Sequence, residues 1–522
     1  MPVEPPRATP SLDTTAIATD AHDGPLAPSD GGDRPSSARA TPPLSPRLYN
    51  NDLAPTEVHG RRWGSYNIFT LWANDVHSLG NYTFATGLFA LGLGAWQVLL
   101  ALAIGAALLF GILNLSGYMG QKTGIPFPVM SRISFGVRGA QIPALIRGAV
   151  AIAWFGIQTY LASHVLNVLL ITLHHPLVHL TENSFLGLST LGWISFGFLW
   201  CVQIGILMYG IEMVRKYEAL AGPVILFTLS ALAVWMFWKA GGSIALSSNH
   251  PLTGGKMWHE IFAGASLWVA VYGTFALNFC DFTRSCTSRK SITIGNFCGI
   301  PVNIMLFGTI AVVLAGAQFR INGHVINSPA DVVQAIPSTW FLALASLALI
   351  VLTVAVNLMA NFVAPAYALA NLFPKRLDFR RAGIVSGVIG VVILPWNLYN
   401  NPTVVNYFLG GLGAFLGPLF GVIIADYWLI RKGRVNVPEL YTMDASAAYH
   451  YTRGVNLRAI AAFAPAAVAA IVCALVPLFS AVAPFAWFTG AGIAAAVYLC
   501  VSERNGNHQD VPGASIAVPS VH

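Results

Sequence analysis

The chain has 522 residues, of which 28 are Lys or Arg and 21 are Asp or Glu, so that only 9% carry a charge whereas 55% are hydrophobic. A soluble globular protein carries about 25% charged residues and could not keep its surface hydrated with so few. The composition therefore excludes a soluble enzyme, a nucleic-acid-binding protein and a disordered chain, and it predicts a polytopic helical protein in a lipid bilayer.

The two ends of the chain are predicted to be tails. Ten of the 31 prolines lie within the first 50 residues, mixed with Ser, Thr, Asp and Gly. Such a segment buries too little apolar surface to offset its ordering entropy, so we expect residues 1–60 to form a disordered tail. Residues 502–522 are also polar, and we expect a second, short tail there.

Twelve apolar segments lie between the tails, and most are long enough for a helix that crosses ~30 Å of hydrocarbon at ~1.5 Å per residue. The first five fall within residues 61–240, the next five within 241–430 and the last two within 431–501. The segments span residues 66–93, 96–118, 141–172, 188–210, 219–240, 258–280, 292–317, 338–362, 383–398, 403–428, 458–479 and 482–501, of which the ninth is short.

The positive charges in the connections predict the orientation. The even-numbered connections between the twelve segments carry 18 Lys and Arg residues, whereas the odd-numbered connections carry only Lys239, Lys256 and Arg320. Cytoplasmic loops of membrane proteins are enriched in Lys and Arg. We therefore expect a multi-pass protein of the plasma (inner) membrane with its even connections and both termini in the cytoplasm.

A polar run, residues 74–81 (NDVHSLGN), interrupts the first apolar segment. Ionisable groups inside a membrane are costly and usually face a cavity or an ion path, and side chains that compete for backbone hydrogen bonds favour local unwinding. The alternative is a position at the membrane edge, although an apolar turn, Tyr66 to Leu71, still precedes the run. Asp75 and His77 are the titratable groups of this run and are candidates for binding a coupling ion.

Two later segments carry amide side chains in mid-membrane positions. In the third, Trp154 and Gln158 share one helical face one turn apart, an arrangement that suits a flat ligand with amide edges. In the eighth, Asn357 and Asn361 have the same spacing. The alternative for both pairs is helix packing, because interhelical amide hydrogen bonds also occur in bundles that bind no ligand.

The segments also show a faint internal echo. The fifth contains Gly222-Pro223 and the tenth contains Gly417-Pro418, and the third and eighth both carry the amides. Two halves of five helices, each beginning with an interrupted helix, are typical of secondary transporters with inverted repeats. In the tenth segment, Gly413, Gly417 and Gly421 have the spacing that most often marks close helix packing.

The sequence gives little support for an enzyme. The six cysteines lie in or beside apolar runs without ligand-like spacing, so we expect buried thiols and neither disulfides nor a metal site. Asp281 with Arg284, and Asp426, lie at cytoplasmic helix ends, where interhelical ion pairs are the simpler explanation. Because no nucleophile is paired with a base, a polytopic membrane enzyme or sensor is only a remote alternative to a transporter.

Eight stretches are specific in combination: Trp72 to His77, Gly124 to Pro128, Arg147, Trp154 to Gln158, Asp281 to Arg284, Asn361 to Tyr367, Pro395 to Asn397, and Gly417 to Tyr427. Together they resemble the nucleobase:cation symporter-1 family, which transports hydantoins, allantoin, uracil and cytosine. The resemblance covers about residues 50–460. It implies an all-α LeuT-type fold of two inverted five-helix repeats plus two extra helices.

The resemblance also implies roles for individual residues. Trp154 is similar to the family's stacking tryptophan, Gln158 to its amide partner, and Asn361 to the asparagine that bonds the substrate. Leu409 occupies the place of the extracellular gate residue on the tenth helix.

Three positions depart from the family pattern. Ser78 stands where the family usually has Asn or Gln. Tyr272 stands where it usually has a second Trp, so the aromatic sandwich around the substrate would have one smaller wall. Ala355 and Val356 replace the Ser-Thr pair whose hydroxyls bind sodium in the sodium-coupled hydantoin members, and neither side chain offers an oxygen to a hard cation.

The sequence therefore predicts a secondary active transporter, which we expect to be a monomer without a cofactor. Its substrate would be a nucleobase-like planar amide heterocycle, and uracil, allantoin, hydantoins, cytosine and purines all remain open. The ring would stack between Trp154 and Tyr272, and Gln158, Asn361 and Ser78 would fix its edges.

The coupling cation is predicted to be a proton. Asp75 and His77 lie where apolar residues are the default, and either could exchange a proton near neutral pH. Asp75 could instead cap the broken helix without titrating, and sodium-coupled or uncoupled transport by the same fold are the alternatives.

Overall fold

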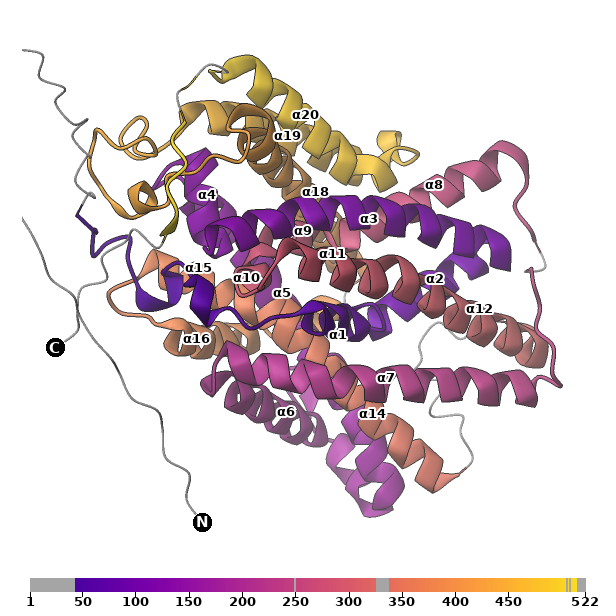
Figure 1. Ribbon diagram of the computed structural model, residues 1–522. Coiled ribbons are helices and arrows are strands. Elements are labelled where there is room, and N and C mark those ends of the chain that lie inside the picture. The colour runs from indigo at the N-terminus through magenta and orange to yellow at the C-terminus, as the bar shows by residue number, and fades with distance from the viewer. Residues whose placement is uncertain are drawn as a thin grey trace, which may run out of the picture. The chain divides into compact units, whose positions relative to one another are not determined.

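The computed structural model describes residues 43–247, 250–324, 338–400, 402–503, 506 and 508–513, with the backbone alone described for 402–410 and 412. These residues form an all-α bundle, as predicted, with one short antiparallel hairpin of β1 (Ser184–Phe185) and β2 (Leu188–Ser189) (Figure 1). The predicted gate residue Leu409 lies outside the residues whose side chains are described.

The first half of the bundle contains seven helices, of which the first two are short and follow one another directly. They are α1 (Ser65–Asp75), α2 (Leu79–Ala90), α3 (Ala95–Thr123), α4 (Phe127–Phe135), α5 (Gln141–Leu173), α6 (Thr190–Met208) and α7 (Ile211–Lys239).

The second half again begins with a divided helix. Its helices are α8 (Gly254–Val271), α9 (Gly273–Asn278), α10 (Cys280–Thr283), α11 (Arg289–Phe297), α12 (Asn303–Asn322), α14 (Thr339–Asn357), α15 (Val363–Leu372), α16 (Phe379–Val392), α17 (Pro395–Tyr399) and α18 (Pro402–Ile424). Three π-helical segments accompany them: η4 (Cys298–Val302) joins α11 to α12, η5 (Leu358–Phe362) joins α14 to α15, and η6 (Ala425–Ile430) extends α18.

Nine helical stretches of the described residues are long and apolar enough to cross a membrane. Three of the twelve expected segments are missing from this set, because each is divided in the structure: α1 and α2, α8 and α9, and α16 and α17. The expected number of twelve is therefore not confirmed. The first two divisions stand at the start of the two halves, which is the pattern expected for inverted repeats.

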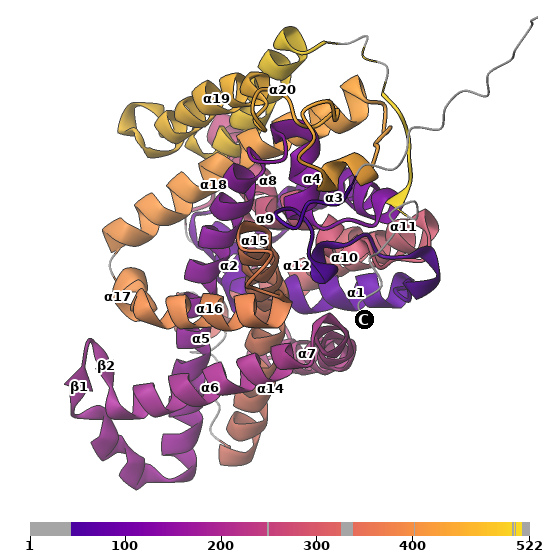
Figure 2. The same ribbon diagram turned by 90° about the vertical axis from the view of Figure 1, so that its left-hand side faces the viewer.

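The last two helices, α19 (Leu457–Leu475) and α20 (Ala486–Val501), pack together and against α18 (Figure 2). A Cβ atom added at Gly417 would collide with the carbonyl oxygen of Trp487, and one added at Gly421 would collide with that of Ala491. At Gly413 the space is open. Two of the three glycines in the predicted packing pattern therefore allow α18 to approach α20.

The ordered part of the chain begins earlier than the sequence predicts. The disordered tail was expected to reach residue 60, yet residues 44–60 pack against the bundle, where Leu53 is fully buried. Asn50 donates hydrogen bonds to the carbonyls of Pro374 and Leu377, at 3.0 and 2.9 Å. The sequence does not show where the ordered part begins, because few side chains are buried between residues 1–42 and α1 and the composition changes little there.

The N-terminal segment lies at the end of the bundle that holds the basic even-numbered connections. Thr56 donates to the Gly124 carbonyl between α3 and α4, at 2.8 Å, and Arg62 donates to the Ser285 carbonyl between α10 and α11, at 3.1 Å. Ser45 donates to the Tyr441 carbonyl, at 2.8 Å. These contacts gather connections that are far apart in the sequence at one end of the bundle (Figure 1).

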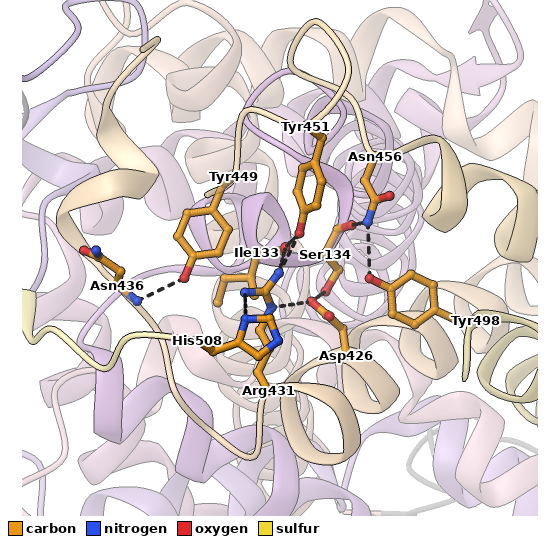
Figure 3. A network of polar contacts seen from close by, with 10 residues as sticks. All are labelled: Ile133, Ser134, Asp426, Arg431, Asn436, Tyr449, Tyr451, Asn456, Tyr498 and His508. Carbon is orange, nitrogen blue, oxygen red and sulfur yellow. Dashed lines mark hydrogen bonds and ion pairs between the residues drawn. The ribbon is translucent and has the colours of Figure 1, made fainter. Parts of the chain in front are cut away.

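A buried ion pair fixes the connection after η6 at this same end (Figure 3). Arg431 Nε lies 3.0 Å from Asp426 Oδ2, and both side chains are almost fully buried. The Asp426 carboxylate also accepts a hydrogen bond from Ser134, at 3.0 Å, and Arg431 donates to the Tyr451 hydroxyl, at 2.6 Å. Each charge thus has further hydrogen-bond partners, which a buried ion pair requires.

The C-terminal segment, expected to be a loose tail from residue 502, packs over this ion pair at residues 508–511. Lys122 lies 2.7 Å from Asp510, and Val511 donates to the Val435 carbonyl, at 3.0 Å. The Arg431 guanidinium lies 3.2 Å from His508 Nδ1. Burial, together with the neighbouring guanidinium charge, holds the pKa of His508 below its ordinary value, so the ring accepts this hydrogen bond as a neutral group.

Candidate substrate and coupling-ion site

The first break lies within the polar run and is closed by its own side chains. Ser78 has an extended backbone and caps α2, because its hydroxyl accepts a hydrogen bond from the Asn81 amide, at 3.4 Å. The Asn81 side chain donates to the carbonyls of Asp75 and Val76, at 3.0 and 3.1 Å. These two carbonyls lie at the C-terminal end of α1, where the next helical turn that would donate to them is missing. The polar run therefore supplies the hydrogen bonds that its own break removes.

The second break is held against the first. Tyr272 separates α8 from α9, and its hydroxyl accepts a hydrogen bond from Asn81, at 3.0 Å. Its ring is only 1% exposed and packs beside Trp72 and Trp268, with centroids 6.0 and 5.6 Å away. Tyr272 therefore joins the two breaks here. Its expected role as a wall of the substrate site remains a prediction.

His77 is held by neutral hydrogen bonds. Its Nε2 lies 3.1 Å from Asn303 Oδ1, and its Nδ1 lies 2.9 Å from the Tyr82 hydroxyl. Asn303 donates its own amide to the Trp72 carbonyl, at 3.3 Å, so its oxygen faces His77 and Nε2 must be the donor. Both ring nitrogens are satisfied without a second proton. These contacts favour a structural role for His77, and Asp75 remains the stronger coupling candidate of the two.

The predicted binding face on α5 holds an amide with unused hydrogen-bonding capacity. Gln158 is 9% exposed, and its side chain has no hydrogen-bond partner among the described residues. Trp154, one turn earlier, is half-buried against the core. A buried amide without partners is costly in a finished core, whereas a binding site leaves such groups for the ligand.

Asn361 lies close by in the π-helical segment η5, which packs against α5. Its amide donates to Asn357 Oδ1, at 3.0 Å, and Asn357 in turn donates to Thr159 and Gln203, at 3.0 and 2.7 Å. This chain of amides fixes Asn361 so that its own oxygen remains free as an acceptor. The π-helical turn is a feature that often marks functional sites.

Arg147 ties the second break to η5 from inside the bundle. It is 1% exposed and donates to Asn278 Oδ1 on α9, at 3.1 Å, and to the Ala360 carbonyl in η5, at 2.8 Å. Asn278 in turn donates to Asp281, at 2.9 Å. The sequence marked Arg147 and Asp281 only as parts of motifs, because their partners lie on other helices.

Other features of the described residues lie away from this site or supply no ligand. Ala355 and Val356 on α14 are buried, and their side chains consist only of carbon and hydrogen. No group of three His, Cys, Asp or Glu side chains suited to a metal occurs in the described part of the chain. A shallow surface hollow between Leu91 and His259 lies near the start of α8 and contains none of the predicted binding residues.

Residues 55–493 match the profile of a protein family described as permeases for cytosine/purines, uracil, thiamine and allantoin. The chain belongs to this family. This permease is 33% identical over 480 residues to an allantoin permease of Bacillus subtilis, which covers 91% of this chain and 96% of that one. It is 34% identical over 445 residues to the purine-uracil permease NCS1 of Arabidopsis thaliana, covering 83% and 72% of the two chains.

The fold of the permease also matches solved transporters. Its TM-score to Mhp1, a nucleobase-cation-symport-1 family transporter in a closed conformation with bromovinylhydantoin bound, is 0.72, at 24% identity over 87% of this chain and 95% of that one. A Na+-coupled sialic acid symporter gives a TM-score of 0.54 at 12% identity, covering 86% and 91%. The predicted family and LeuT-type fold are confirmed. The permease is an integral membrane transporter of the secondary type, not an enzyme.

Proposed function

We propose that this permease imports allantoin or a closely related planar amide heterocycle, together with a proton. Two relatives that match almost to full length support the substrate class. They are the allantoin permease of Bacillus subtilis, and a putative allantoin permease of Escherichia coli that is 30% identical over 466 residues, 95% of that chain.

The observation that carries the proposal is the pairing of Gln158 with Asn361 on elements that pack together. Gln158 offers both a carbonyl and an NH2 group, and Asn361 offers an oxygen whose neighbours are already satisfied. A heterocycle with alternating N–H and C=O groups complements both amides, and the Trp154 indole supplies a flat apolar face. Ser78 and Tyr272 would then contact the ligand once the packed break between them opens.

The transport cycle follows from the divided helices. α1 and α8 end at the level of the site, so each half-helix can move without unfolding its partner, as alternating access requires. Asp75 lies at the C-terminal end of α1, where the helix dipole favours positive charge, and this favours binding of a cation there. Because the side chains of Ala355 and Val356 carry no oxygen, we assign the coupling role to a proton.

The orientation and assembly proposed from the sequence complete this function. Both termini and the basic connections lie on the cytoplasmic side of the plasma membrane. Leu409 closes the outer side of the site. The protein transports its substrate as a monomer. The Lys and Arg asymmetry supports the orientation.

Uptake of labelled allantoin into proteoliposomes, with unlabelled competitors, tests the substrate class. Allantoin and hydantoin should compete in the micromolar range, and cytosine, which lacks an imide edge, should need at least about tenfold more. Absence of labelled allantoin uptake above the background, with uptake of labelled cytosine or uracil into the same proteoliposomes, would overturn the assignment. Empty liposomes give the background.

A further inference from the structure

Glu218 is a buried acid that the proposed site does not use. It lies two turns inside α7 and is 4% exposed. Both of its carboxyl oxygens are buried, and neither has a hydrogen-bond partner among the described residues. An ionised carboxylate without partners is among the most costly groups to place inside a membrane protein, and such groups usually mark ion or proton paths.

The side-chain oxygen of the neighbouring Asn74 also lacks a hydrogen-bond donor. Asn74 on α1 donates its side-chain amide to the backbone carbonyls of Thr70 and Glu218, at 2.7 and 2.9 Å, so the Asn74 side-chain oxygen points away from these two carbonyls. That oxygen is buried and has no partner in the described residues. Asn74 and Glu218 therefore present three unmet acceptor atoms, and the Asn74 amide is already engaged as a donor elsewhere. One proton on the Glu218 carboxyl would supply the missing donor.

No cation compensates the Glu218 carboxyl within the described residues. The nearby charge is a second acid, Asp75, which directly follows Asn74 on α1, and the Asn74 amide donates to the Glu218 carbonyl. Arg215, one turn away on α7, is engaged by Glu212, at 2.9 Å, and Lys216 is exposed. The elements packed against α7 are α1, α6, α12 and α14, and their ionisable side chains are Tyr66 and Asp75 on α1, Cys201 on α6 and Arg320 near the far end of α12.

Two neighbouring acids without a cation cannot both ionise at low cost, so such a pair holds a proton in common. Asp75 stands at the end of α1, at the first break, whereas Glu218 lies on the continuous helix α7. α1 and α7 lie side by side (Figures 1 and 2), and the Tyr66 hydroxyl donates to the Ala219 carbonyl, at 3.1 Å. Movement of α1 against α7 would separate the two acids and change their access to water.

We propose that Glu218 is a proton-binding site of the transport cycle, with Asp75 as its partner acid. The proposal rests on the proton-coupled function given above and names the group that carries the proton. Outside, a carboxylate of the pair takes up one proton and becomes a carboxylic acid that donates to Asn74. After α1 moves, the acid releases the same proton to the cytoplasm, and no other bond changes.

Gradient-driven uptake and exchange, measured separately, test this role. Proteoliposomes carry wild-type permease, Glu218→Gln, or the control Glu212→Gln, which removes an acid of the same helix that is paired and partly exposed. With the membrane potential clamped at zero, an inward pH gradient of about one unit should let wild type and Glu212→Gln accumulate labelled allantoin up to about tenfold. Glu218→Gln should only equilibrate allantoin, yet should still exchange labelled for unlabelled substrate.

The other outcomes count against the proposal in distinguishable ways. Tenfold accumulation by Glu218→Gln would remove Glu218 from the cycle and leave proton coupling intact. Loss of exchange together with accumulation in a folded Glu218→Gln would show a merely structural role. If wild type itself ignores the pH gradient, the proton-coupled function fails and the proposal fails with it. If Glu218→Gln does not fold, Glu218→Asp takes its place and should accumulate allantoin with a shifted pH profile, whereas an unshifted profile would contradict the proposal.

Discussion

Gln158 and Gln203 show how one residue type serves two purposes in neighbouring helices. Gln203 on α6 donates to Thr159 and to the Leu199 carbonyl, both at 3.1 Å, and accepts from Asn357. Gln158, which is also buried, has no such partner among the described residues. The first amide completes the core, and the second is left for a ligand.

Truncating the ligand amides should therefore weaken substrate binding more than it weakens the fold. A buried hydrogen-bonding group left without its partner costs about 1–3 kcal/mol, so Gln158→Ala and Asn361→Ala should each raise the dissociation constant about tenfold to a hundredfold. Titration calorimetry on purified protein measures this change. Gln97→Ala, which removes an amide on α3 outside the site, is the matched control, and wild-type affinity in both site variants would place the site elsewhere.

The contacts of His77 could not be predicted, because a hydrogen-bond pattern depends on partners that the sequence does not place. The run of residues 74–81 predicts a break and two titratable groups. Asn303, which lies 3.1 Å from His77, comes from the second half of the chain and has no recognisable spacing to it. No sequence pattern marks Glu218 either, because it sits in an ordinary helical stretch and only its burial and missing partners single it out.

At the scale of helices, the packing of α18 on α20 depends on two glycines and gives a test with an internal control. The added Cβ in Gly417→Ala would collide with backbone of α20 and should force the helices apart, at a cost of about 1–3 kcal/mol. Gly413→Ala places the same methyl group in open space and should be neutral or slightly stabilising, because Ala favours the helix.

Thermal unfolding of the detergent-solubilised permease measures both variants. The account expects a lower Tm for Gly417→Ala only. Equal Tm values for the two variants would mean that the small-residue pattern does not hold these helices together.

The limits of prediction at this scale are visible in the divided helices. Apolar length located the helical segments, and the polar run predicted the first division. The division is shorter than the polar run, because the Ser78 cap begins α2 at Leu79. No polar run in the sequence marks the division at Tyr272. The Tyr272 hydroxyl takes its hydrogen bond from Asn81 on another helix, so its partner is not a neighbour along the chain. The π-helical turn at Asn361 left no mark in the sequence either.

At the scale of the whole molecule, the basic connections, the N-terminal segment and the C-terminal segment meet at one end of the bundle. The helical bundle could be predicted from the apolar composition, and the inverted repeat from the echo between the two halves and the resemblance to the family. The ordered edges at residues 44–60 and 508–511 could not. They depend on a few contacts, such as Lys122 with Asp510, that an unremarkable polar composition conceals.

The orientation of this end is open to direct labelling. On a cysteine-free background, a Cys at Asn322, at the end of α12, should react with an impermeant maleimide added to intact cells, and a Cys at the exposed Arg434 should react only after permeabilisation. The reverse pattern would place the basic end outside and contradict the proposed topology. Equal total labelling after permeabilisation shows that both variants are present in the membrane.

The measurement that tests the central claim most directly is allantoin uptake under imposed ion gradients. Proteoliposomes with wild-type permease receive an inward pH gradient without sodium, or an inward sodium gradient at constant pH. The account predicts accumulation with the pH gradient, indifference to sodium, and loss of the pH effect in Asp75→Asn. Accumulation driven by sodium at constant pH, with no response to the pH gradient, would contradict it.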